Sequence, residues 1–250
     1  MGQYLLGDIA DVIELQHVKV GYKNKPIFPT LTGTFKLGSL TAIMGDNGVG
    51  KTTLLKTLMH TITPLAGNII FHGDSSKSIA WLPQYSDVDR QFPMTVFDTV
   101  AMGAVNHTSL FKSLSKSDNL RIQDAISKVG VTDLIHRSIN TLSGGQFQRM
   151  LFARMLVQDA DILIMDEPFV GIDTATQEQL LFLIKTLHHQ GKTIIAVLHD
   201  ANIVHQHFPS LLHISQQNIY WGKTAQRNLH HHDCFDRIKH NSPFKQKGNR

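Results

Sequence analysis

The sequence predicts an α/β fold organised around a phosphate-binding loop, and three observations support this fold class. Residues 45–52 fit the pattern G-x-x-x-x-G-K-[ST], and they lie between a short apolar run and a segment with helical spacing. Residues 162–165 and 193–198 are nearly continuous apolar runs, which are typical of parallel strands covered on both faces. Residues 175–188, between these runs, have the spacing of a crossover helix. Strands that alternate with helices in this way form parallel sheets.

The composition is that of an ordinary globular protein, with 42% hydrophobic and 18% charged residues among 250. No apolar run reaches 18 residues, and no basic stretch followed by an apolar core opens the chain, so we expect neither a membrane span nor a signal peptide. The single cysteine, Cys234, rules out an internal disulfide and fits a reducing compartment. The net charge of +4 is mild and gathers in residues 226–250, so we expect no nucleic-acid partner.

The N-terminal part of the chain is predicted to be a series of short strands that follow a loose leader at residues 1–11. Alternating or continuous apolar residues mark these strands, and glycines and polar turns separate them. The predicted elements are strands at 12–15, 18–20, 33–37, 39–44, 69–71 and 79–82, and a helix at 53–59.

The character of the chain changes between about residues 84 and 155, where strand-like runs are rare. Three segments there have helical spacing, at 95–102, 119–129 and 144–156, so we interpret this region as a mostly helical insert. A hairpin of residues 211–215 and 218–221 is predicted to close the fold.

A triphosphate carries several negative charges, so the phosphate-binding loop must supply many hydrogen-bond donors at once. Gly45, Gly48 and Gly50 lack a Cβ, so the backbone can curl and bring its N–H groups close to phosphate oxygens. Lys51 adds a positive charge, and the Thr52 hydroxyl is suited to hold Mg²⁺. The alternative is a turn that only resembles such a loop. The predicted ATP contacts here are Gly45, Asp46, Asn47, Gly48, Val49, Gly50, Lys51, Thr52 and Thr53.

Two acids follow the apolar run at residues 162–165, at the end of a predicted parallel strand. Such strand ends are where α/β sheets bind ligands. We expect Asp166 to help hold Mg²⁺ and Glu167 to orient or deprotonate the attacking water. Taken alone, the pair is better interpreted as two surface acids at a strand end. The presence of Lys51 favours the functional interpretation.

The segment Leu-Ser-Gly-Gly-Gln at residues 142–146 resembles the signature motif of the ATP-binding cassette (ABC) ATPases. The order of the motifs is also similar to that family: phosphate-binding loop, Gln84, signature, Asp-Glu strand, Asp173 and His199. The resemblance covers roughly residues 12–221. It implies a P-loop NTPase core with an antiparallel β subdomain and a helical subdomain at about 84–155, in a single domain of residues 12–225, followed by a basic, histidine-containing tail at 226–250.

The resemblance also implies roles for residues outside the phosphate-binding loop. Ser143, Gly144, Gly145 and Gln146 would present donors at a helix start to the γ-phosphate of ATP bound by a second copy of the chain, so that two ATPs join a homodimer. Asp173 would lie near the seam between the two copies.

Three further residues have implied roles around the nucleotide. Gln84 would reach the metal and the attacking water, and His199 would hydrogen-bond both the γ-phosphate and Glu167. Tyr22 would stack on adenine. The alternatives are a satisfied core histidine for His199 and an ordinary strand-end aromatic for Tyr22.

Three kinds of ATPase share these motifs: transporter subunits, chromosome or DNA-repair ATPases, and soluble translation or cluster-assembly ATPases. The chain has no heptad run for the second kind and one cassette instead of the two of the translation factors. Residues 84–103, 167–173 and 199–200 are similar to zinc, manganese and iron uptake cassettes. The resemblance therefore implies an importer ATPase at the cytoplasmic face of the cell membrane, with separate permease chains and an extracytoplasmic metal-binding protein. The alternatives are a siderophore or haem importer and a cluster-assembly ATPase.

The histidines gather toward the C-terminal end, where ten of the 15 fall between His188 and His240. Residues 230–234 read His-His-His-Asp-Cys, which are ligand types that zinc accepts. We favour a solvated tail that binds metal only adventitiously, because consecutive histidines rarely converge on one ion without a scaffold. The alternative is a regulatory metal sensor.

Overall fold

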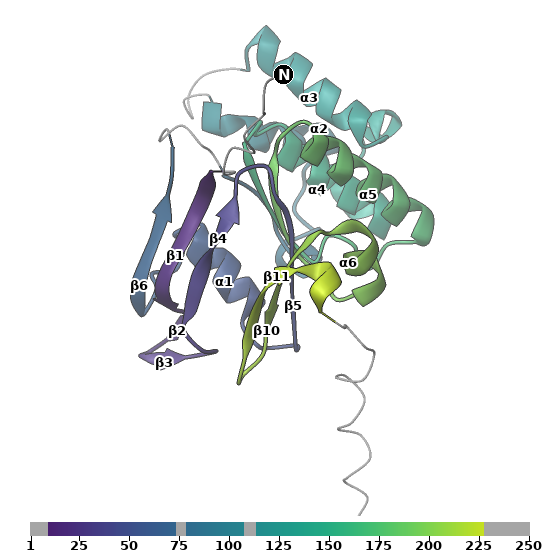
Figure 1. Ribbon diagram of the computed structural model, residues 1–250. Helices are drawn as coiled ribbons and strands as arrows, with labels where there is room; N and C mark the ends of the chain where they lie inside the picture. The colour runs from purple at the N-terminus through teal and green to yellow at the C-terminus, as the bar shows by residue number, and fades with distance from the viewer. Residues whose placement is uncertain (1–9, 74–78, 108–113, 228–250) are drawn as a thin grey trace, which may run out of the picture.

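The computed structural model describes residues 10–73, 79–107 and 114–227, and its centre is a six-stranded sheet (Figure 1). The strand order is β11-β10-β5-β9-β8-β7, and all neighbours are parallel except β10 and β11, which form the predicted C-terminal hairpin. The strands are β5 (Leu40–Gly45), β7 (Ile79–Leu82), β8 (Ile162–Asp166), β9 (Thr193–Val197), β10 (Ser210–Ile214) and β11 (Ile219–Lys223). The predicted parallel sheet is confirmed.

Side chains of the central strands alternate between two separate hydrophobic cores. Along β8, Ile162 and Ile164 enter one core, while Leu163 and Met165 enter the other. The first core lies against helix α1 (Lys51–Leu58) and the N-terminal strands. The second lies against the helices α5 (Thr174–His189) and α6 (Ala201–His207) and the helical group described below. This coverage explains the continuous apolar runs, because a strand buried on both faces needs no polar side.

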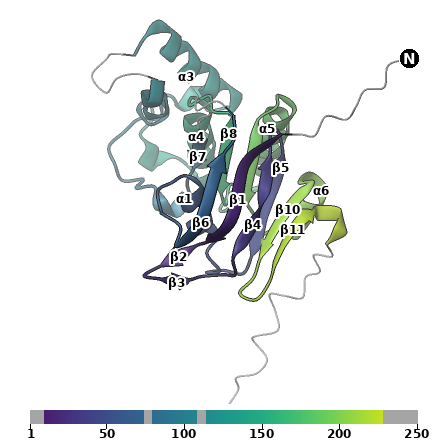
Figure 2. The ribbon, with the colours of Figure 1, turned by 60° about the vertical axis from the view of Figure 1, so that its left-hand side comes forward.

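The N-terminal strands form the antiparallel part of the fold (Figure 2). Its three-stranded sheet has the order β4-β1-β6, and a two-stranded ribbon of β2 and β3 lies beside it. The bounds are β1 (Asp11–Lys19), β2 (Gly21–Tyr22), β3 (Lys25–Pro26), β4 (Leu31–Lys36) and β6 (Ala66–Phe71). The prediction of two strands at 12–15 and 18–20 was wrong, because β1 is continuous. The pairing of β1 with β4 changes register between Leu15 and Val18, and His17, with a φ of 51°, lies at this irregularity. The pairing continues on both sides of it.

The predicted helical insert contains α2 (Val96–Ala101), α3 (Lys116–Lys128) and α4 (Gly144–Leu156), which pack on one another and which we call the helical group. It lies at one end of the molecule, away from β2 and β3 (Figures 1 and 2). Short 3-10 turns complete the chain: η1 (Tyr85–Asp87), η2 (Met102–His107), η3 (Thr132–Leu134), η4 (Ile139–Thr141) and η5 (Thr224–Gln226). Helix α6, of seven residues, was not predicted.

Among the described residues, no helix combines the length and apolar character that crossing a bilayer requires. The predicted leader at residues 1–11 falls almost wholly outside the described residues. Of the predicted basic tail at 226–250, the residues from 228 onward also lie outside the described residues. These include the histidine segment at 230–234.

Candidate active site

The carboxyl ends of four neighbouring parallel strands bring the predicted site residues to one edge of the sheet. Strand β5 runs into the phosphate-binding loop, and Gln84 follows β7 after one residue. Asp166 ends β8, and His199 follows β9 after one residue. Parallel strands share the direction of their ends, so residues far apart in the sequence meet here.

The phosphate-binding loop adopts a conformation that needs its glycines. Gly45 has a φ of 152°, and a Cβ there would lie 2.1 Å from the Ile214 carbonyl oxygen. Gly50 has a φ of 104° where helix α1 begins. Val49 is buried beneath the loop, while Asp46, Asn47 and Gly48 are exposed. The exposure of Asp46 leaves its carboxylate in solvent, which limits the repulsion that an acid would exert on a bound anion.

Lys51 is folded under its own loop and is 6% exposed. Its Nζ donates to the carbonyl oxygens of Gly45 at 2.8 Å and Asp46 at 3.0 Å. The loop therefore holds a desolvated positive charge beside the first turn of α1, whose N-terminus favours an anion.

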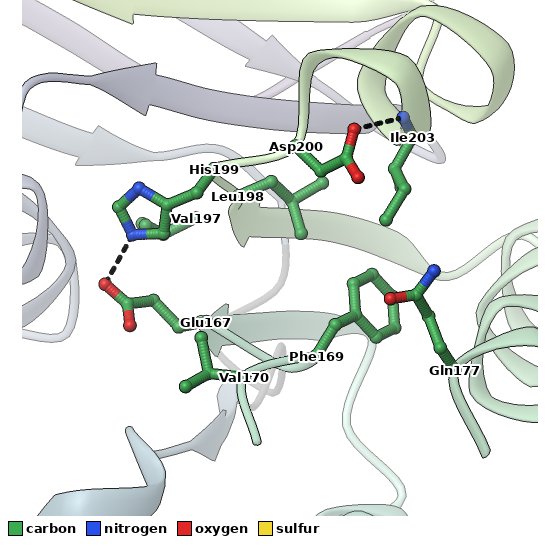
Figure 3. Close-up of a pocket in the computed structure, with 9 residues that line it drawn as sticks. All are labelled: Glu167, Phe169, Val170, Gln177, Val197, Leu198, His199, Asp200 and Ile203. Carbon is green, nitrogen blue, oxygen red and sulfur yellow. Dashed lines mark hydrogen bonds and ion pairs between the residues drawn. The ribbon is translucent and has the colours of Figure 1, made fainter. Parts of the chain in front are cut away.

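Glu167 is held between Gln84 and His199. Gln84 Nε2 donates to Glu167 Oε2 at 2.9 Å, and His199 Nε2 is 2.6 Å from Glu167 Oε1 (Figure 3). The backbone of Glu167 has a φ of 52°, a left-handed conformation that is costly for a residue with a side chain. Its N–H still donates to the Val197 carbonyl at 3.2 Å, so β9 holds this turn in place. The three predicted catalytic residues are thus in direct contact.

Asp166 is fully buried beside this cluster, and neither carboxylate oxygen has a hydrogen-bond partner among the described residues. Burial raises the pKa of Asp166, and the nearby Glu167 and Asp87 carboxylates act in the same direction. The Thr52 hydroxyl and the Lys51 ammonium oppose this shift. A buried carboxylate whose charge is stabilised, among the described residues, only by the Thr52 hydroxyl and the Lys51 ammonium is chemically suited to a divalent cation.

A cavity of about 130 Å³ adjoins the Glu167–His199 pair (Figure 3). Phe169, Val170 and Ile203 make much of its wall apolar. No residue of the phosphate-binding loop lines it, so it lies beside the nucleotide cleft implied by that loop.

The signature segment begins helix α4, as predicted. The Ser143 Oγ accepts from the Gln146 N–H at 3.2 Å, and the Gln146 Oε1 accepts from the Ser143 N–H at 2.9 Å. A Cβ on Gly144 would lie 2.8 Å from the Gly171 carbonyl oxygen, so the first turn packs on the loop after β8. Within the described ranges, no hydrogen bond joins Ser143 or Gln146 to the phosphate-binding loop of the same chain.

Asp173 caps helix α5. Its carboxylate accepts from the Thr176 N–H and from the Thr176 hydroxyl, both at 2.9 Å, and these bonds lower the pKa of Asp173. Gly145 packs against the same two residues. In this structure Asp173 stabilises the start of α5. Its place at a dimer seam stays a prediction.

Tyr22 lies on β2 and is 54% exposed. Its hydroxyl is 3.5 Å from the Thr53 Oγ1, at the start of helix α1. The ring therefore stands beside the phosphate-binding loop with much of its surface available for a partner.

Two residues near the site were not predicted. Gln148, fully buried in α4, donates through Nε2 to the Pro168 carbonyl at 2.9 Å, directly after Glu167. Arg90 contacts both the segment after Gln84 and the residue before Ser143. Gln148 belongs to no motif recognised in the sequence, and Arg90 lies within residues 84–103 without a role of its own in the prediction. Their partners Pro168 and Leu142 lie 20 and 52 residues away, so spacing along the chain gave no signal.

Comparisons with known proteins identify the relatives of this chain. The family model described as "ABC transporter" matches residues 28–170. The manganese transport system ATP-binding protein MntB of Bacillus subtilis is 38% identical over 216 residues, which cover 85% of this chain and 86% of that protein. The zinc transport system ATP-binding protein TroB of Treponema pallidum is 38% identical over 217 residues, which cover 85% of this chain and 82% of that protein.

Solved structures give the same result. An ABC transporter assigned to the metal-chelate type, in an inward-facing conformation, matches with a TM-score of 0.79 and 28% identity over 87% of this chain and 85% of that chain. The cbiO1 protein of Clostridium perfringens, part of the transporter complex cbiONQ, matches with a TM-score of 0.73 and 27% identity over 87% and 90% of the two chains. A phosphate-binding loop, a signature helix and a shared fold over most of the length agree, and the chain belongs to the ABC transporter family, as one of its ATP-hydrolysing subunits.

Proposed function

We propose that this chain powers a metal-ion importer for zinc, manganese or iron, by ATP-driven closure of a homodimer. The observation that carries the catalytic part of this proposal is the contact of Glu167 with both Gln84 and His199 at the strand ends beside the phosphate-binding loop. A carboxylate held by two neighbours is a prepared general base, and it stands next to a loop built to hold a triphosphate.

The phosphate-binding loop would hold the triphosphate of ATP through its backbone N–H groups and Lys51. The Lys51 Nζ, which donates to two carbonyls of its own loop, would turn to the β- and γ-phosphates. Thr52, Asp166 and Gln84 would hold Mg²⁺, and the two unpartnered oxygens of Asp166 are the observation that fits this ion. When bound, Mg²⁺ neutralises charge on the phosphate oxygens.

Glu167 would accept a proton from the attacking water, while Gln84 and His199 fix its orientation. The two hydrogen bonds occupy different oxygens of the carboxylate, which restricts its rotation. His199 would also donate to the γ-phosphate. The strained backbone of Glu167 is consistent with a side chain whose direction is set by the surrounding structure.

A homodimer is proposed because the signature turn presents donors at the start of α4, whereas the phosphate-binding loop leads into a different helix, α1. Ser143 and the N–H groups of the first turn of α4 are suited to an anion, and no described hydrogen bond connects them to the phosphate-binding loop of the same chain. Two copies facing opposite ways would bring each turn to the other copy's ATP.

The metal class rests on the relatives, which are named for manganese and zinc transport. The match to an ABC transporter assigned to the metal-chelate type keeps a siderophore or haem importer as the second candidate. In either case the partners would be separate permease chains and an extracytoplasmic binding protein, and the chain would work at the cytoplasmic face of the cell membrane. Recovery of the chain with membranes only when a permease is co-expressed would support this assembly, whereas a cluster-assembly ATPase would stay off the membrane.

Glu167→Gln tests the proposed catalytic role directly. The amide keeps the size of the side chain but lacks the basicity, so ATP turnover should fall by roughly 100-fold or more. ATP should still bind, and the protein should elute as a dimer with ATP and Mg²⁺ but as a monomer without them, measured by light scattering. Glu178→Gln, an exposed change on α5, is the matched control and should behave as the wild type. Unchanged turnover in Glu167→Gln would remove this residue from its proposed role.

A further inference from the structure

Arg90 has an unusual set of contacts for an arginine in a loop. One terminal nitrogen donates to the Tyr85 hydroxyl and the other to the Leu142 carbonyl. The guanidinium carbon lies 4.8 Å from the centroid of the Phe147 ring and 5.4 Å from that of the Tyr85 ring. These two rings meet edge to face, with centroids 5.3 Å apart. Arg90 is thus fixed by two hydrogen bonds and two aromatic contacts.

The contacts of Arg90 join its own segment to that of Leu142, which lies 52 residues further along the chain. Tyr85 directly follows Gln84, which donates to Glu167. Leu142 directly precedes Ser143, the residue that caps the signature helix α4. A continuous path of contacts therefore runs from Glu167 through Gln84, Tyr85 and Arg90 to the start of α4.

The contacts depend on the shape of the guanidinium as much as on its charge. No ion pair with a carboxylate is formed by Arg90 within the described ranges, and its Nε is buried without a hydrogen-bond partner there. A planar fork can donate in two directions while its face lies on an aromatic ring, whereas a lysine ammonium is a compact point charge. Lysine would keep the positive charge and one of the two hydrogen bonds, but it would lose the connection between Tyr85 and Leu142.

We propose that Arg90 is a positioning residue that holds the Gln84 segment and the signature turn at a fixed separation. The proposal rests on the proposed function, in which Gln84 serves the ATP of its own chain and Ser143 serves the ATP of the second copy. With Arg90 in place, a displacement of one segment carries the other with it, so both composite sites are completed together. The occupancy of the phosphate-binding loop does not depend on Arg90, which touches none of its residues among the described contacts.

Arg90→Lys separates this positioning role from a general role in folding. The melting temperature should not change measurably, and the dissociation constant for ATP should stay within about twofold of the wild type. The kcat should fall roughly 10- to 100-fold, the cost of a small misplacement. Tyr85→Phe, which removes one hydrogen bond and keeps both ring contacts, should show a smaller fall in kcat. Arg121→Lys is the matched control, because Arg121 contacts Asp118 on α3 and not the site.

Hydrogen exchange on the monomer provides a readout that needs no dimer. In Arg90→Lys, the amides of the first turn of α4 should exchange about tenfold faster than in the wild type, while those of α3 stay unchanged. In the Glu167→Gln background, Arg90→Lys should raise the ATP concentration needed for dimer formation. If Glu167→Gln alone forms no dimer, the proposed function fails. If it does, and Arg90→Lys changes neither exchange nor kcat, or lowers ATP affinity and melting temperature together with kcat, the positioning role of Arg90 is wrong.

Discussion

Asp166 and Glu167 are adjacent carboxylates in opposite surroundings. Glu167 accepts from two neighbours, whereas Asp166 is fully buried with both oxygens unpartnered in the described part of the chain. Burial of an unpartnered carboxylate destabilises the folded state, because the charged form loses its hydration without replacement. A residue of this kind is retained where a ligand completes its surroundings, so at Asp166 stability and function should change in opposite directions.

Asp166→Asn should make the protein without nucleotide or metal more stable and inactive. The amide is still polar but carries no charge, so it avoids the extra cost of burying an unpaired ion, and the free energy of unfolding at neutral pH should rise by roughly 1–3 kcal/mol. Hydrolysis should be lost, and Mg²⁺ with ATP should stabilise the variant less than the wild type. Urea denaturation with and without the ligands measures both effects, and Asp161→Asn, an exposed acid before the same strand, serves as the control.

The stability gained in Asp166→Asn should depend on pH, and the direction of the Asp166 pKa shift determines how. The pKa of Asp166 is raised, so the folded protein keeps this proton to a higher pH than the unfolded chain does. The wild type therefore loses stability as the pH rises from the ordinary aspartate value of 3.8 through the folded pKa, and Asp166→Asn does not. The stability difference between the two should grow across that range. A difference that is constant with pH, or a less stable variant, would contradict this account.

The sequence predicted those site residues whose role is indicated by the residues next to them in the chain. Lys51 follows its glycines directly, and Glu167 ends an apolar strand. Gln84 and His199 were placed by resemblance, since nothing local distinguishes them from other polar residues. Arg90 and Gln148 were missed, because their contacts with Leu142 and Pro168 exist only after the helical group packs on the sheet.

At the scale of elements, three helices of the helical group begin in the same way. Thr95, Ser115 and Ser143 each cap a helix and exchange hydrogen bonds with the residue three positions later. The prediction for α3 began at residue 119, but the helix starts at Lys116, because the cap lies before the first apolar position. Helix α6 was missed for a related reason: its seven residues include two histidines and an asparagine and too few apolar positions to reveal a period.

The bounds of the sheet strands also show that local sequence patterns predict some elements better than others. Strands β8 and β9 were predicted nearly to the residue, since their runs are apolar on both faces. Strand β1 was divided in the prediction at Gln16-His17, where polar residues interrupt the alternation. In the fold, neighbours on both sides, β4 and β6, hold β1 as one strand across that point.

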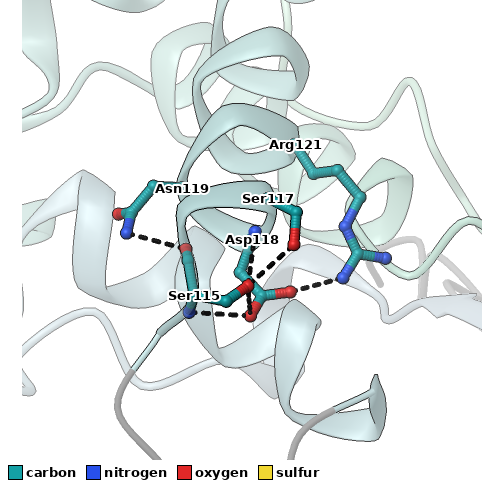
Figure 4. A network of polar contacts seen from close by, with 5 residues as sticks. All are labelled: Ser115, Ser117, Asp118, Asn119 and Arg121. Atoms are coloured by element: carbon teal, nitrogen blue, oxygen red, sulfur yellow. Dashed lines mark hydrogen bonds and ion pairs between the residues drawn. The ribbon is translucent and has the colours of Figure 1, made fainter.

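The start of α3 provides a test of capping. The Ser115 Oγ donates to Asp118 Oδ2 at 2.6 Å and accepts from the Asp118 N–H at 3.1 Å, and Arg121 contacts the other carboxylate oxygen (Figure 4). Ser115→Ala should lower the free energy of unfolding by about 1 kcal/mol. Ser127→Ala, an exposed change near the end of the same helix, should not lower it. Thermal and urea denaturation measure both.

The same substitution should move the titration of Asp118. Bonds from Ser115, and then Arg121, lower the pKa of Asp118 to about 2. A lowered carboxyl pKa contributes stability above the ordinary value of 3.8, and that contribution is lost as the pH falls through about 2. Ser115→Ala should therefore raise the Asp118 pKa toward 3.8 and reduce the acid sensitivity that this group causes. Carboxyl carbon shifts in NMR report the pKa directly, and an unchanged value would show that Ser115 is not the main cause.

At the scale of the whole molecule, the central sheet separates two cores, and the two halves of the proposed composite site lie on different sides of that division. The phosphate-binding loop leads into α1, which packs in the core with the antiparallel sheet, while the signature turn begins α4 in the core with the helical group. Asp166 and Glu167 belong with the first half, at the end of β8. One chain therefore offers two half-sites, each of which the proposed homodimer would complete with the other copy.

This arrangement predicts that two inactive variants restore activity when mixed. Lys51→Ala disables the phosphate half, and Gly144→Asp disables the signature half by adding a charge and a side chain 2.8 Å from the Gly171 carbonyl. In a mixed dimer both defects fall in one composite site and the other site is intact. With random pairing, half of the dimers are mixed, so about a quarter of the wild-type sites should hydrolyse ATP. Steady-state turnover of the equimolar mixture measures this.

The matched control is a mixture of Lys51→Ala with Glu167→Gln. These two residues belong to the same half-site, so each composite site of a mixed dimer carries one defect and the mixture should stay inactive. Sites contained within one chain would give no recovery in either mixture, because every chain has a defect. Recovery in the first mixture alone is therefore the pattern that only catalysis between two opposed copies produces, and its absence would overturn the homodimer mechanism while leaving the contacts around Glu167 intact.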